Sequence, residues 1–93
     1  TIRMIAFEEF TVEVFQSNDI KKLKQILDMM ELFMVEGTEE LDTAVATGYW
    51  EGLLNRDPDE VQFSQFAHLM GPKSIDYCRG WDEFCGVKTK GLW

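Results

Sequence analysis

The sequence is poor in the residues that build most catalytic and metal sites. It has one histidine and two cysteines. His68 stands beside Ala67 and Leu69, and no serine or cysteine can be assigned to it as a nucleophile. Two cysteines with one distant histidine match no zinc spacing, and the acidic runs lack the alternation of a calcium loop. We therefore expect no enzymatic activity, no metal ion and no cofactor.

Basic residues are also scarce. Nine lysines and arginines stand against 17 aspartates and glutamates, for a net charge of −8. Binding to nucleic acid needs clustered basic side chains, which this sequence lacks. Charged residues interrupt every apolar stretch within about ten residues, too short for a membrane span, and no secretory signal is visible. These features predict a cytoplasmic protein that binds neither nucleic acid nor membranes.

Cys78 and Cys85 lie in one predicted helix, seven positions apart. At about 1.5 Å per residue their separation is roughly 10 Å, whereas a disulfide requires less than about 7 Å. Both are expected to be reduced thiols in the core, which fits a cytoplasmic protein.

The residues that are abundant predict one all-α domain over residues 1–93. Seven phenylalanines and three tryptophans can fill a single core in a chain of this size. Apolar residues recur at helical spacing throughout, and no segment has the period of a strand. The expected architecture is an antiparallel bundle of about five helices, near residues 3–16, 19–36, 39–55, 58–70 and 73–85.

The first two predicted helices are amphipathic and joined by a short polar turn. Phe7, Phe10 and Val14 form the apolar stripe of the first, and we expect Phe7, Phe10 and Phe33 in the core. The segment 17–19, Ser-Asn-Asp, can end one helix and cap the next.

The third predicted helix carries small residues along one face. Ala44, Gly48 and Gly52 would form a groove that another helix can approach closely, which offsets the cost of about 1 kcal/mol per helical glycine. Three aromatic residues, Trp50, Tyr77 and Trp81, fit either the core or a binding surface, with the core favoured.

The segment after Asn55 predicts a fourth helix. Asp57 would be its cap, Pro58 its first residue, and Glu60 stands three residues after the cap. Gly71 would end it. In the fifth helix, Ile75, Cys78 and Cys85 define one stripe, and Tyr77, Trp81 and Phe84 define an adjacent one. Residues 87–93 are expected to be irregular, with Trp93 either loose or pinned to the domain.

Acidic residues concentrate in the middle of the chain. Residues 37–71 contain seven carboxylates and one base, Arg56, for a net charge of −6. Such a surface suits a basic protein partner, because opposite fields accelerate association. A solvated face that keeps the protein soluble is the alternative. The candidate partner-binding residues flank two predicted helix starts: Glu39, Glu40, Asp42, Asp57, Asp59 and Glu60.

The second half of the chain resembles a family of small bacterial helical proteins. The resemblance covers residues 48–86 and rests on Gly-Tyr-Trp-Glu-Gly-Leu-Leu-Asn at 48–55, Leu-Met-Gly-Pro-Lys-Ser at 69–74, and the aromatic segment from Tyr77 to Phe84. Where that family often has a tryptophan before its closing glycine, this chain has Cys85. Such proteins occur near polymorphic and contact-dependent growth inhibition toxins and look like their immunity proteins.

This resemblance implies an immunity protein that neutralises a cognate toxin. The toxin would be a basic ribonuclease or deoxyribonuclease domain, with its active site or substrate groove covered by the acidic surface. The alternative is a self-associating helical scaffold or adaptor without a toxin partner. In that case the groove at Ala44, Gly48 and Gly52, or exposed aromatic residues, would form the seam of a homodimer.

Overall fold

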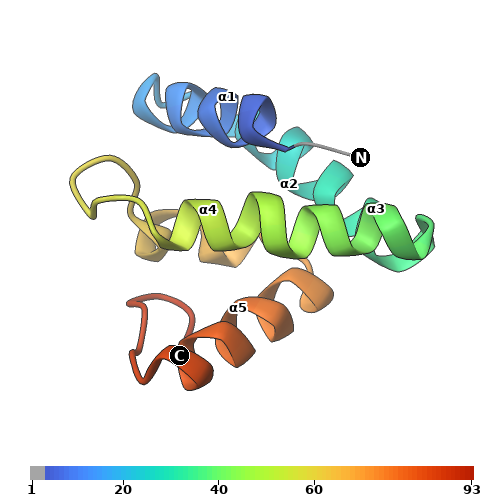
Figure 1. The fold of residues 1–93 in the computed structure, drawn as a ribbon. Helices are drawn as coiled ribbons and strands as arrows, with labels where there is room; N and C mark the ends of the chain where they lie inside the picture. Colours follow the sequence, from blue (N-terminus) through green and yellow to red (C-terminus); the bar gives the residue numbers. More distant parts are fainter. Residues whose placement is uncertain (1–3) are drawn as a thin grey trace.

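The computed structural model describes residues 4–93, which fold around one core (Figure 1). The described residues contain helices and turns and no strands. The elements in chain order are α1 (Ile5–Gln16), α2 (Ile20–Glu36), α3 (Glu39–Thr43), the π-helix η1 (Ala44–Trp50), α4 (Glu51–Leu54), the 3₁₀ turns η2 (Phe63–Gln65) and η3 (Ala67–Leu69), and α5 (Pro72–Cys85). None of the helices described is long and apolar enough to cross a bilayer.

The turn between α1 and α2 has the predicted chemistry. Asn18 adopts the left-handed conformation (φ 59°), which asparagine tolerates better than most residues. The carboxylate of Asp19 accepts a hydrogen bond from the backbone N–H of Lys22 (3.1 Å) and caps α2. The predicted bounds of these helices are confirmed to within two residues, and residue 3, where the first was expected to begin, lies outside the described part.

The predicted third helix is confirmed in extent but not in type. α3, η1 and α4 follow one another without a break and form a single long central helix, between α1 and α5 in Figure 1. Thr38 caps it, accepting a hydrogen bond from the N–H of Leu41 (3.2 Å). Seven residues in its middle are π-helical, a rare form that the sequence did not predict.

The glycines of the central helix allow a close approach of α1. The sequence predicted that a helix would pack on this face. A Cβ atom on Gly48 would lie 3.4 Å from Cβ of Met4, and one on Gly52 would lie only 1.7 Å from Oε1 of Glu8. Glu8 is almost fully buried, and its carboxylate accepts a hydrogen bond from Nε of Arg56 (2.6 Å). α1 therefore occupies the surface of Gly48 and Gly52, which excludes a homodimer seam there.

The predicted helix at 58–70 is wrong, so residues 4–93 form four helices where five were expected. Val61 and Gln62 are not helical, Gln62 is extended, and only the two short 3₁₀ turns follow before α5. The predicted cap, Asp57, instead accepts a hydrogen bond from the N–H of Asp59 (2.9 Å) within the turn. The physical reason is burial: Val61, Phe63 and Phe66 all reach the core, whereas Val61 and Phe63, two residues apart, would point to opposite sides of an α-helix.

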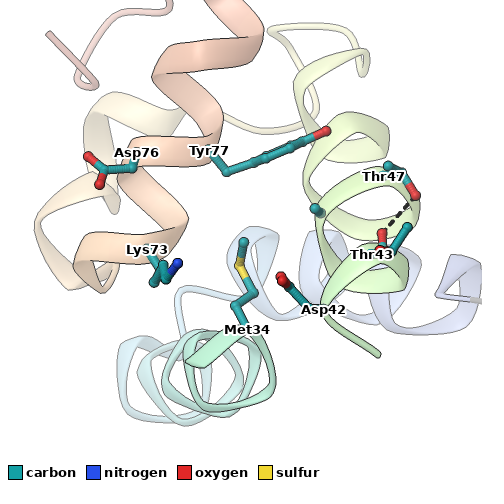
Figure 2. Close-up of a pocket in the computed structure, with 8 residues that line it drawn as sticks. Met34, Asp42, Thr43, Thr47, Lys73, Asp76 and Tyr77 are labelled. Carbon is teal, nitrogen blue, oxygen red and sulfur yellow. Dashed lines mark hydrogen bonds between the residues drawn. The ribbon is translucent and has the colours of Figure 1, made fainter. Parts of the chain in front are cut away.

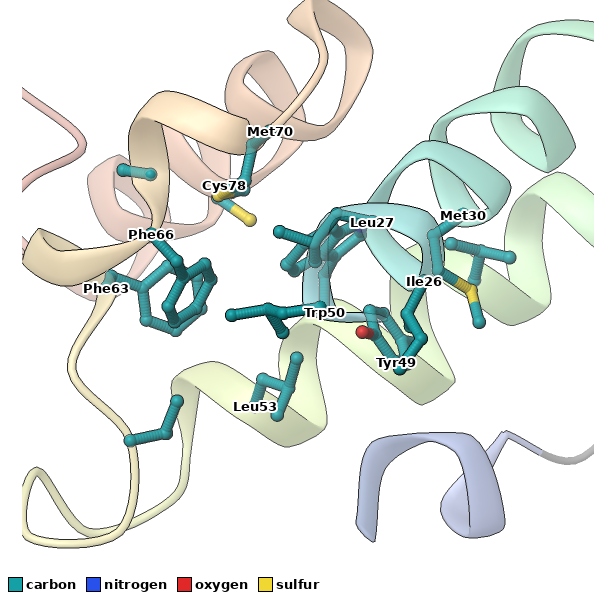
Figure 3. Packing of buried hydrophobic residues seen from close by; sticks show 14 of the residues in the cluster. Ile26, Leu27, Met30, Tyr49, Trp50, Leu53, Phe63, Phe66, Met70 and Cys78 are labelled. Carbon is teal, nitrogen blue, oxygen red and sulfur yellow. The ribbon is translucent and has the colours of Figure 1, made fainter. Parts of the chain in front are cut away.

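The core lies between α2, the central helix and the segment 61–70 (Figure 3). Trp50 and Tyr49 are fully buried, with their rings edge to face at 4.9 Å, and the hydroxyl of Tyr49 is hydrogen-bonded to that of Thr11 (2.7 Å). Among residues 4–93, the indole N–H of Trp50 is a buried donor with no hydrogen-bond partner. The preference for Trp50 in the core is confirmed.

Two expectations about α1 are wrong. Phe7 and Phe10 are 41% and 43% exposed, although their spacing predicted the core. α1 is rotated so that Glu8 and Thr11 face inward instead, because Arg56 and Tyr49 provide their hydrogen-bond partners. Phe33 is partly buried and packs against the core as expected.

The two cysteines are both reduced but lie in different environments. Cys78 is fully buried, and burial, together with the charge of Asp82, raises the pKa of its thiol. Cys85 is exposed, so the prediction that it lies in the core is wrong.

The chain after Gly86 is irregular, as predicted, and it is pinned to α5. The buried carboxylate of Asp82 accepts hydrogen bonds from the backbone N–H and the hydroxyl of Thr89 (2.7 and 2.8 Å) and from the indole N–H of Trp93 (3.0 Å). Leu92, which lies between Thr89 and Trp93 in the sequence, is fully buried. Of the two alternatives for Trp93, the structure selects the pinned one.

The start of α5 is capped from another helix. Gly71, at the cap position, has no side chain, and the carboxylate of Glu31 in α2 accepts hydrogen bonds from the N–H groups of Lys73 and Ser74 (both 2.9 Å) and from the Ser74 hydroxyl (2.8 Å). A Cβ atom on Gly71 would lie 2.3 Å from this carboxylate. Glu31 therefore fixes the position of α5 against α2.

We predict that Glu31→Ala lowers the free energy of unfolding by about 1 to 2 kcal/mol, because α5 loses its cap. Chemical denaturation measures this change. Asp28→Ala, on the same helix, is the matched control: Asp28 forms an exposed ion pair with Lys24, and its loss should cost less than about 0.5 kcal/mol. Equal effects of the two substitutions would contradict the capping role.

Candidate functional site

The six predicted partner-binding carboxylates do not form one surface. Glu39, Glu40 and Asp42 lie at the start of α3. Asp57, Asp59 and Glu60 lie in the loop after α4, at the opposite end of the central helix (Figure 1). The helix between them is on the order of 20 Å long. A single small partner site therefore has to use one group or the other.

The second group is partly engaged within the chain. Nη1 of Arg56 lies 3.1 Å from the carboxylate of Glu60, and Arg56 also binds Glu8. Asp57 holds the turn at Asp59, as described above. These contacts assign the loop a structural role in joining α1 to the central helix.

The first group borders a groove. An open hollow of about 470 Å³ lies between the end of α2, the start of the central helix and the start of α5 (Figure 2). We call it the α3–α5 groove. Its lining residues are Met34, Asp42, Thr43, Ala46, Thr47, Lys73, Asp76 and Tyr77.

The groove combines charged walls with an apolar floor. Asp42 from α3, and Asp76 and Lys73 from α5, place two carboxylates and one ammonium group at its edges (Figure 2). The Thr47 hydroxyl donates a hydrogen bond to the carbonyl of Thr43 (2.8 Å) and is thereby held along the helix. The thioether of Met34 supplies apolar surface, so the groove offers both charge and apolar contact to a ligand.

Tyr77 closes one end of the groove and is fixed there. Its hydroxyl donates a hydrogen bond to the carboxylate of Glu51 at the start of α4. Burial, together with this hydrogen bond and the charge of Glu51, raises the pKa of Tyr77. Tyr77 therefore remains a neutral donor at physiological pH, and its ring has a defined orientation.

A second, smaller hollow lies beside the groove, along α5. It measures about 380 Å³ and is lined by Asp76, Tyr77, Gly80, Trp81 and Phe84, which we call the α5 surface. Asp76 and Tyr77 line both hollows, so the two are adjacent. The rings of Trp81 and Phe84 are stacked, with centroids 5.6 Å apart and planes at 23°, and Phe84 is 81% exposed.

The sequence contained part of the signal for this surface. Tyr77, Trp81 and Phe84 were predicted to share a stripe of the last helix, and they do, but core was the favoured reading of Tyr77 and Trp81, which are only half-buried. The adjacent stripe decides the orientation of α5. Ser74, Cys78 and Asp82 are buried because Glu31 and the tail bind two of them.

Other candidate chemistry is sparse in the described residues. His68 is exposed on η3. Residues 4–93 contain no group of three or more histidine, cysteine, aspartate or glutamate side chains placed to hold a metal ion.

Comparison with known proteins places the chain in a family without an assigned role. A family model described as a domain of unknown function (DUF7674) matches residues 2–86. No curated protein and no solved structure matches the chain. The matched range includes all four helices and the residues of both hollows, and it stops before the tail.

We predict that Phe84→Ser changes the free energy of unfolding by no more than about 0.5 kcal/mol, because the side chain is exposed. Phe66→Ala should cost about 3 to 5 kcal/mol, because that ring is fully buried. Urea denaturation of both variants checks the pair. A large loss for Phe84→Ser would show that the ring supports the fold and is not free for a partner.

Proposed function

This chain belongs to the DUF7674 family, and we propose that it acts by binding a basic partner protein through the α3–α5 groove and the α5 surface. The observation that carries the proposal is the stacked pair of Trp81 and Phe84, held at the protein surface beside carboxylates. Aromatic residues of this kind provide most of the binding energy in many protein interfaces.

The charge of the protein supports a basic partner. The net charge is −8, and Asp42, Glu39 and Glu40 lie at the end of the central helix that borders the groove. Opposite fields accelerate association and align the partners before contact. The carboxylates would then direct the encounter, and the aromatic residues would hold the complex.

We propose that this partner is a nuclease toxin domain, which the family resemblance of residues 48–86 implies. A nuclease needs a basic groove to bind phosphates. An acidic surface with projecting aromatic rings is a suitable cover for such a groove, because it matches the charge and adds apolar contact. The proposed role is therefore that of an immunity protein.

The test is growth rescue with the neighbouring gene product. We expect a secreted protein with a toxic C-terminal domain to be encoded beside this chain, and we expect co-expression of the chain to restore growth of cells that produce this domain. A neighbour without such a domain, or continued toxicity in the presence of folded chain, would contradict the immunity role.

The same pair of proteins locates the binding surface. Reversal of charge at Glu39, Glu40 and Asp42 should slow association at low salt about tenfold or more, as measured by surface plasmon resonance. Reversal at Asp57 and Asp59, at the far end of the central helix, is the control and should change the rate little. A larger effect of the reversal at Asp57 and Asp59 would place the binding surface at the loop after α4 instead.

Self-association is the second candidate, and the exposed rings of Trp81 and Phe84 are the observation that favours it. The other proposed seam is filled by α1. Sedimentation equilibrium separates the candidates: a stable homodimer that Phe84→Ser converts to a monomer would favour the scaffold, and a monomer at micromolar concentration would favour a heterologous partner.

A further inference from the structure

Gly80 has no explanation within its own chain. It lies in the middle of α5, where glycine is among the least favourable residues for a helix. The glycines of the central helix are accounted for by contacts with Met4 and Glu8, but within the described residues a Cβ atom on Gly80 would meet nothing within 4 Å. A close approach by another molecule would account for the missing side chain.

The residues around Gly80 form a small depression, which we call the seat. Tyr77, Trp81 and Phe84 stand around it and line the same hollow, so a group placed over Gly80 would contact aromatic rings on both sides. Because the glycine has no side chain, the backbone of α5 is accessible at this point. A small or aliphatic side chain, carried on a regular backbone element, fits this shape.

The charges beside the seat have one predominant sign. Asp76 and Glu83 are exposed and lie two helical turns apart on the same side of α5. Glu51 and Asp42 lie beyond Tyr77, on the central helix. Of the nearby bases, Arg79 keeps its charge but is turned to the tail, where it donates to the carbonyl of Leu92, and Lys73 lies at the far end of the groove. The apolar seat therefore runs between two rows of carboxylates.

We infer that the α5 surface receives a basic amphipathic helix of the partner, which crosses α5 at Gly80. An apolar residue of this helix packs over Gly80 between Trp81 and Tyr77, and its lysines or arginines pair with Asp76 and Glu83 on one side and with Asp42 on the other. The inference rests on the partner-binding function proposed above, and it holds whether or not the partner is a toxin.

The probe is a synthetic amphipathic helix of leucine and lysine, titrated into ¹⁵N-labelled protein. We expect chemical-shift changes centred on Tyr77, Gly80, Trp81 and Phe84. A twin peptide with glutamate in place of every lysine should bind at least about tenfold more weakly, which corresponds to the loss of roughly one favourable charge contact.

Substitution of Gly80 gives effects of opposite sign on folding and binding. Gly80→Ala should raise the melting temperature by about 4 °C or more, because helix propensity improves and no clash arises. Gly80→Leu should weaken binding of the lysine peptide about tenfold, because its side chain fills the seat. Phe10→Ala, which removes an exposed ring from α1, is the control and should leave binding unchanged.

Three results would overturn the inference: shifts located away from α5, equal binding of both peptides, or unchanged affinity of Gly80→Leu. Failure of growth rescue with retained binding of the lysine peptide would reject the toxin partner and keep the helix seat. Growth rescue that Gly80→Leu leaves unchanged would keep the toxin partner and reject the helix seat.

Discussion

The fold depends on the close packing of α1 against the central helix. Gly48 and Gly52 let the two backbones approach, and the space above Gly52 is filled by the carboxylate of Glu8. A buried carboxylate is stable only with a partner, and Arg56 provides it from just beyond the end of α4. The same arginine binds Glu60, so one buried charge orders α1, the central helix and the loop that follows.

This arrangement decides which surfaces remain available. α1 covers one side of the central helix, α2 and the segment 61–70 cover the core residues of its π-helical middle, and α5 lies along the remaining side. Asp42, near the start of the central helix, then lines a groove together with α5, whereas the carboxylates after α4 belong to the structural loop. The candidate site therefore lies where the last helix meets the beginning of the central one.

Periodicity and cap residues were sufficient to predict four of the helices, because each contains a strong apolar stripe and a polar cap or glycine at its ends. They failed at 58–70, where cap chemistry resembled that of a helix but the buried residues, Val61, Phe63 and Phe66, do not follow the helical period. The faces of α1 and α5 were also misjudged in part. Their orientation depends on hydrogen bonds between distant residues, such as Thr11 with Tyr49 and Glu31 with Ser74, which no local pattern reveals. The acidic residues of the sequence separate into two groups in space because the length of the central helix lies between them.

The attachment of the tail to Asp82 has a consequence for recognition. α5 is held at its start by Glu31 and near its end by Asp82, and both carboxylates act on a side of the helix next to that of the aromatic residues. The helix is thus preorganised, with little backbone entropy left to lose when a ligand binds. Preorganisation of this kind favours slow dissociation, so in the proposed complex the tail would contribute to its lifetime through contacts made on a neighbouring face of the helix.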